Sequence, residues 1–198
     1  MHYVGNIIFK EWESYPWKNE LSCQSERAVI HFNEVFSEDF EREHEPLDML
    51  DRAIVLAGFS VRRLIERKLV TDRLAKTKIS VRSFVTKPDV EFRTPFHSLM
   101  GGDYLIHNVD WEKQEPISLS YNELANEIIH SSQIMVCAKN QKMEAGLLIA
   151  SDWNVKRRLL HLTIDEFTSY VRAVLDDRVT SMMDFRDEAG KAHSRRDG

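Results

Sequence analysis

Apolar residues between Leu47 and Arg73 recur at alternating steps of three and four. One stripe contains Leu47, Leu50, Ile54, Ala57, Val61 and Leu64, and a second beside it contains Met49, Ala53, Leu56 and Phe59. This spacing predicts an amphipathic helix over about residues 47–73, with Pro46 in its first turn. Because the helix is apolar on two faces, we expect it to contact more than one element at the centre of the fold.

A second helix is predicted over about residues 120–131. Ser120 followed by Glu123 matches a capping box, in which each side chain binds a free backbone amide at the helix start. The apolar residues expected on its buried side are Leu124, Ala125, Ile128 and Ile129. The polar residues expected on its other side are Glu123, Asn126, Glu127 and His130.

Three short apolar runs follow, over Gln133–Ala138, Glu144–Ala150 and Arg157–Thr163. Polar segments separate them, so the pattern predicts a three-stranded antiparallel meander across about residues 133–163. Thr163 and Glu166 form another capping box. It begins a predicted helix over about residues 164–180 with one apolar face.

The remaining segments have weaker patterns. Residues 1–20, rich in aromatic side chains, are expected to form an ordered arm on the surface. Residues 25–40 fit either a helix or, in part, a strand, and the helix is favoured. Residues 76–116 should be the least regular, with strands at Ile79–Val85 and Tyr104–His107. Residues 184–198 are expected to be a polar, frayed tail.

Together these elements predict an α+β fold in one domain, residues 1–183. It would have an antiparallel helical core, the three-stranded meander and a C-terminal helix. The length of 198 residues and the hydrophobic share of 42% suit one sizeable core.

The charge distribution limits the classes of partner. A net charge of −5 arises from 27 basic and 32 acidic residues that are interspersed. A whole-surface nucleic-acid binder is disfavoured, so any RNA contact would need a local basic patch. The spacing of Cys23 and Cys137 matches no metal or redox motif, which suggests reduced thiols in an intracellular protein. Without a secretory signal or an apolar run of about 18 residues, we expect a cytoplasmic protein that does not enter a membrane.

The topology of the meander predicts where a site would form. The start of its first strand, the end of its second and the start of its third lie at one end. The helix that carries His130 leads directly into the first strand, so its last turn should meet the segment Ser151–Arg157. This arrangement would gather His130 with Asp152, Trp153, Lys156, Arg157 and Arg158.

The motif Asn126-Glu127-Ile128-Ile129-His130, near the end of a helix with a long antiparallel partner, resembles the HEPN superfamily of prokaryotic helical proteins. The resemblance implies a homodimer. Many members are metal-independent ribonucleases that pair an arginine with a histidine a few residues later. Asn126 and His130 match the polar residue and the histidine as catalytic candidates. The arginine is not matched, because Glu123, Leu124 and Ala125 stand where it would be.

Three functions stay open. The first is a catalytically degenerate, HEPN-like interaction or RNA-associated module in a prokaryotic stress or defence setting, such as a toxin–antitoxin system. The second is an active ribonuclease that uses His130 with an arginine from elsewhere, namely Arg62, Arg63 or Arg157. The third is a structural subunit of a larger assembly that includes another protein partner.

Each candidate residue also has a structural explanation. RNA could stack a base on Trp153 and place phosphates on Lys156, Arg157 and Arg158. Equally, His130 fits a histidine bonded near a helix end, and the basic residues fit a solvated surface. The other histidines show no grouping typical of a metal site, so neither a metal nor a cofactor is expected.

Overall fold

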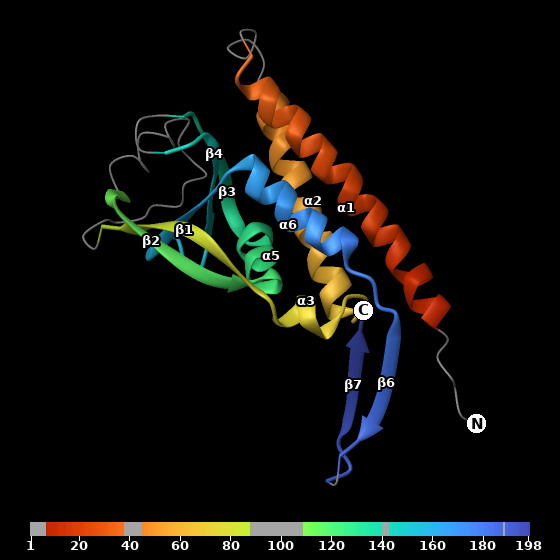
Figure 1. Cartoon of the computed structure of the whole chain (residues 1–198). Coiled ribbons are helices and arrows are strands. Elements are labelled where there is room, and N and C mark those ends of the chain that lie inside the picture. The colour runs from red at the N-terminus through yellow and green to blue at the C-terminus, as the bar shows by residue number, and fades with distance from the viewer. Residues whose placement is uncertain (1–6, 38–44, 88–108, 140–142, 188) are drawn as a thin grey trace.

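The computed structural model describes residues 7–37, 45–87, 109–139, 143–187 and 189–198. In chain order the elements are α1 (Ile7–Val35), α2 (Glu45–Glu66), α3 (Asp72–Lys76), β1 (Lys78–Thr86), β2 (Val109–Ser120), α5 (Tyr121–Ile129), β3 (Ser131–Cys137), β4 (Gly146–Ser151), β5 (Arg158–Leu162), α6 (Ile164–Asp176), β6 (Ser181–Arg186) and β7 (Ala192–Asp197). Helices pack against an antiparallel sheet, so the predicted α+β class is confirmed (Figure 1).

The sheet has five strands in the order β2-β1-β5-β4-β3. The predicted meander is confirmed within it, since Ile149 of β4 is paired with Ile134 of β3 and Leu160 of β5. Strand β1 extends the sheet from β5, with Arg82 opposite His161. The first predicted strand of the 76–116 segment is therefore confirmed, whereas Tyr104–His107 lies outside the described residues.

Strand β2 was not predicted. It lies at one edge of the sheet, and most of its middle residues are exposed. An exposed edge strand needs no regular alternation of apolar side chains, and charged residues and Pro116 suit such a position. The pattern of the segment was therefore too polar to be recognised as a strand.

Two apolar clusters lie on opposite faces of the sheet. The larger one joins the sheet to the helices and includes Leu147 and Ile149, and the smaller one includes Leu148 and Ala150. Because successive side chains of a strand point to opposite faces, β4 is buried on both sides. Both predicted capping boxes, Ser120 with Glu123 and Thr163 with Glu166, are confirmed.

Helix α2 ends at Glu66, so the predicted extension to Arg73 is wrong. Lys68 adopts a left-handed conformation, with φ of 58°. The backbone amides of Lys68 and Leu69 donate to the carbonyls of Ile65 (2.9 Å) and Leu64 (2.8 Å), which is the pattern of a Schellman motif. Leu69 is buried in the loop that follows the helix. Its apolar side chain fits the spacing of the helical stripe, which is why the sequence predicted a longer helix.

For residues 7–20 the expected surface arm is wrong, because α1 is a continuous helix from Ile7 that contains Pro16, and residues 1–6 lie outside the described residues. The helix predicted over 25–40 is confirmed as far as Val35. Helix α1 lies along α2 (Figure 1) and buries Leu21, Ala28 and Phe32 in the larger cluster. Proline is unfavourable inside a helix, so the local sequence argued against a continuous helix here. Packing of α1 on α2 stabilises that helix nevertheless.

The expected frayed tail is wrong as well. Strands β6 and β7 form a hairpin that projects from the body of the molecule (Figure 1). Arg196 of β7 attaches the hairpin to α3, where its backbone amide donates to Asp72 (3.2 Å) and its guanidinium forms an ion pair with the same carboxylate. The C-terminal helix was predicted to about residue 180 and ends at Asp176.

Candidate functional site

The last turn of α5 meets the turn between β4 and β5. His130 ends α5, and its carbonyl oxygen accepts a hydrogen bond of 3.0 Å from the backbone amide of Asp152. The imidazole of His130 lies against the indole of Trp153, with ring centroids 4.3 Å apart and planes tilted by 40°. The topological argument from the sequence thus placed these two side chains correctly.

Helix α2 adds Arg62 to this site. Gly58, one turn earlier, allows the close approach of α2 and α5, because a Cβ atom there would lie 2.8 Å from Cγ2 of Ile128. Nη1 of Arg62 lies 3.4 Å from Nε2 of His130, and Nε of Arg62 donates to Oε1 of Glu66 at 2.6 Å. We call Arg62, His130 and Trp153 together the His130 corner.

A buried ion pair lies next to the corner. Oε1 of Glu127 accepts hydrogen bonds from Nδ2 of Asn154 (2.5 Å) and from Nη2 of Arg158 (2.9 Å). Glu127 is only 6% exposed, so its predicted place on the polar face of α5 is wrong. The three side chains connect α5 to the β4–β5 turn and to β5, which positions Trp153 on that turn beside His130.

The other predicted site residues are not gathered at one point. Arg158 is half-buried and forms an ion pair with the buried Glu127 at 2.9 Å, so its guanidinium faces α5. The guanidinium of Arg63 lies over the ring of Trp17, 5.5 Å from its centroid, and so faces α1. Lys156 and Arg157 are exposed on the turn that carries Trp153.

Asn126 is half-buried one helical turn before His130. Its Oδ1 atom is inaccessible to solvent and accepts no hydrogen bond from any residue in the described part of the chain.

The sequence placed Glu127 beside His130 but did not reveal its burial or its hydrogen bond with Asn154. The only signal was topological. If the last turn of α5 meets Ser151–Arg157, a carboxylate three residues before His130 can reach the same turn.

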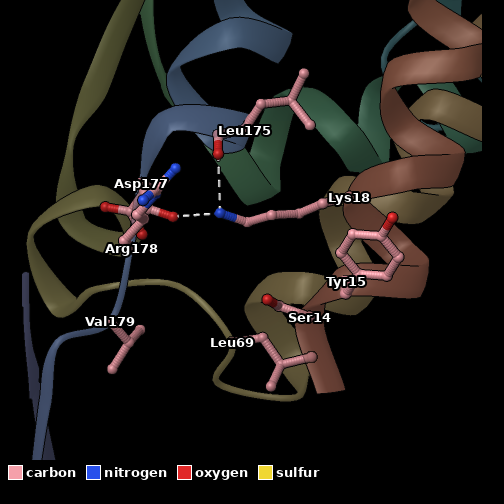
Figure 2. Close-up of a pocket in the computed structure, with 8 residues that line it drawn as sticks. All are labelled: Ser14, Tyr15, Lys18, Leu69, Leu175, Asp177, Arg178 and Val179. Atoms are coloured by element: carbon pink, nitrogen blue, oxygen red, sulfur yellow. Dashed lines mark hydrogen bonds between the residues drawn. The ribbon is translucent and has the colours of Figure 1, made fainter. Parts of the chain in front are cut away.

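A separate cavity of about 160 Å³ lies where α1, the loop after α2 and the end of α6 meet (Figure 2). Nζ of Lys18 donates to the backbone carbonyls of Leu175 (2.9 Å) and Asp177. The Asp177 carboxylate accepts hydrogen bonds from the amide (2.7 Å) and hydroxyl (2.6 Å) of Thr71. These contacts satisfy backbone groups at the end of α6 and connect it to α1 and to the loop after α2, so these residues have a structural role.

Among the residues that the structure covers, no group of three or more His, Cys, Asp or Glu side chains could hold a metal ion. Within the same ranges, none of the helices has both the length and the hydropathy of a membrane-spanning helix.

Comparison of the chain with family models, with curated proteins and with solved structures gives no match. The resemblance to HEPN proteins therefore depends on the motif from Asn126 to His130 and on the pairing of its helix with α2.

Proposed function

We propose that the His130 corner binds single-stranded RNA, and that the chain is a HEPN-like, non-cleaving RNA-associated module of a cytoplasmic stress or defence system. The observation that carries this proposal is Trp153, a large aromatic side chain that is 64% exposed and lies against His130. An unpaired base can stack on such a ring, whereas bases within a duplex cannot. Arg62 supplies a guanidinium, which suits a phosphate oxygen.

The charges around the corner support weak binding. Lys156 and Arg157 are exposed on the same turn, but Asp152 is exposed there too, and Glu66 partly neutralises Arg62. Few free cations mean few phosphate contacts, so the affinity should be low and should fall only gently as salt is added.

An active ribonuclease is the second candidate, and one distance favours it. Arg62 brings a cation to within 3.4 Å of His130, although the family's own arginine position is not matched. RNA cleavage needs a cation to stabilise the phosphate in the transition state and a group that transfers protons. Arg62 and His130 could fill these two roles.

The test uses a short fluorescein-labelled oligouridine at low salt, with binding read by fluorescence anisotropy. Removal of a stacking partner costs about 1–3 kcal/mol of binding free energy, so Trp153→Ala should bind several-fold more weakly at least. Tyr15→Ala is the matched control, since Tyr15 is an aromatic residue 71% exposed on α1. Equal affinity of Trp153→Ala and the unmodified protein would contradict the proposal.

Cleavage is followed on gels with the same RNA, with and without a chelator. Intact RNA is expected. Chelator-resistant cleavage that is lost in both His130→Ala and Arg62→Gln would instead establish the ribonuclease.

Homodimerisation, implied by the resemblance, is also a proposal. It is supported by apolar side chains exposed on the paired helices α1 and α2, among them Ile30 and Phe59 at 54% and 43%. Light scattering at micromolar concentration should give about twice the chain mass of 23.2 kDa. A mass equal to one chain would contradict it.

A further inference from the structure

We infer that RNA binding at the His130 corner is coupled to the uptake of a proton by His130, because a phosphate group replaces the imidazole as the acceptor for Arg62. The inference rests on the proposed RNA binding and adds a pH dependence to it.

The unliganded geometry defines the starting state. A guanidinium has only N–H donors, so Nε2 of His130 must be the acceptor in its 3.4 Å contact with Nη1 of Arg62. An imidazole that accepts at Nε2 carries its single ring hydrogen on Nδ1 and is neutral. In the corner without RNA, the Nε2 atom of His130 therefore faces the Arg62 cation as a hydrogen-bond acceptor.

The charged groups around His130 have other partners. From α2, Glu66 is bonded to Arg62. From α5, Glu127 is bonded to Asn154 and Arg158. From the β4–β5 turn, Asp152 reaches His130 through its backbone amide. Among the described residues, no carboxylate is bonded to the imidazole, so an incoming phosphate would be its first anionic partner.

Phosphate reverses the roles at Nε2. Its oxygens only accept hydrogen bonds, and they attract Arg62 more strongly than a neutral ring nitrogen does. Once Arg62 donates to phosphate, Nε2 of His130 can face the same anion only as a donor. The imidazolium gains that charged hydrogen bond, and the adjoining Trp153 ring favours a cation as well. The proton comes from solvent, and no covalent bond other than this N–H is formed or broken.

The experiment measures oligouridine binding by calorimetry in two buffers of different ionisation enthalpy, and by anisotropy between about pH 6 and about pH 8. We expect proton uptake on binding and an affinity that increases as the pH falls. Full linkage to a proton changes the affinity about tenfold per pH unit, and partial linkage changes it less.

His130→Gln should abolish the proton uptake, because an amide does not titrate. His193→Gln is the matched control, since His193 lies on the projecting hairpin and pairs with Asp187. Near-ultraviolet circular dichroism checks that both variants fold. The carbon-13 shift of the His130 ring in the unmodified protein reports its charge directly, with and without RNA, and needs no variant.

The outcomes separate the two proposals. RNA binding with no proton uptake, or with uptake unchanged in His130→Gln, would overturn the inference and leave the proposed function standing. A His130 ring that changes tautomer but stays neutral on binding would also overturn it. If the unmodified protein binds no RNA at any of these pH values, both proposals fail.

Discussion

Among the residues that the structure describes, His130 and His161 each contact an arginine, and they lie in different environments. His161 of β5 is 1% exposed. Its Nδ1 accepts a hydrogen bond from Nε of Arg82, and its Nε2 donates to the carbonyl of Glu144, both at 3.0 Å. Arg82 in turn forms an ion pair with Glu166. His130 shows the same sequence of partners, with Arg62 bonded to the ring and Glu66 bonded to Arg62.

The two histidines differ in solvent exposure and in the hydrogen-bonding capacity that remains for a ligand. Both ring nitrogens of His161 are bonded, and its ring lies 6.4 Å from that of Phe84 in the smaller apolar cluster. His130 is partly exposed, its arginine contact is longer, and its aromatic neighbour Trp153 is open to solvent. An arginine–histidine pair therefore does not identify a binding site by itself. Exposure and unused hydrogen-bonding capacity distinguish the two.

The largest expected effect concerns the packing on which both histidine regions depend. Ile54 is 0% exposed on α2, the helix that also carries Arg62. Ile54→Ala should lower the free energy of unfolding by about 2–5 kcal/mol through lost contacts and a cavity. Urea unfolding measures this, with Met183→Ala on the projecting hairpin as the exposed control, since Met183 is 64% exposed. Equal stability of the two variants would place the core elsewhere.

The next effect tests the comparison directly. His161→Ala leaves Arg82 and the Glu144 carbonyl without a buried partner and should cost about 1–3 kcal/mol of unfolding free energy. His130→Ala should change that free energy by less than about 0.5 kcal/mol. Both values come from the same urea titrations. A larger loss at His130 than at His161 would reverse the assignment of structural and binding roles.

A smaller effect is expected from pH. Burial, together with the nearby Arg82 cation, lowers the pKa of His161 below its ordinary value of 6.5. Below that pH the unfolded chain binds a proton that the folded chain does not, so unfolding becomes more favourable as the pH falls. The loss stops growing once the pH passes below the folded pKa.

His161→Gln removes this titration, so the difference in stability between the unmodified protein and this variant should shrink as the pH decreases from neutral. A difference that stays constant or grows would show that His161 is not held neutral.

The smallest effect concerns the exposed turn. Arg157→Ala should weaken oligouridine binding slightly and reduce the slope of log affinity against log salt by about 1 or less, because it deletes a phosphate contact. Arg186→Ala, at an exposed position of the hairpin, should leave the slope unchanged. An identical slope for Arg157→Ala and the unmodified protein would exclude Arg157 from the site.

Local sequence was sufficient for several elements. The capping boxes at Ser120 and Thr163 depend on residues three apart, and the stripe of α2 depends on steps of three and four. These interactions lie within one element, so they can be recognised without knowing the fold. The meander followed from apolar runs and polar turns. Its topology alone brought His130 to Trp153.

Long-range packing decided the rest. Arg62 and His130 are 68 residues apart, and they meet because Gly58 lets α2 approach α5 closely. The burial of Glu127 depends on Arg158, a residue 31 positions away, so no periodicity within α5 could reveal it. The attachment of the β6–β7 hairpin to α3 likewise depends on contacts between Arg196 and Asp72. These three features depend on the free energy of contacts between segments that are distant in sequence. The spacing of hydrophobic residues within one segment does not encode such contacts.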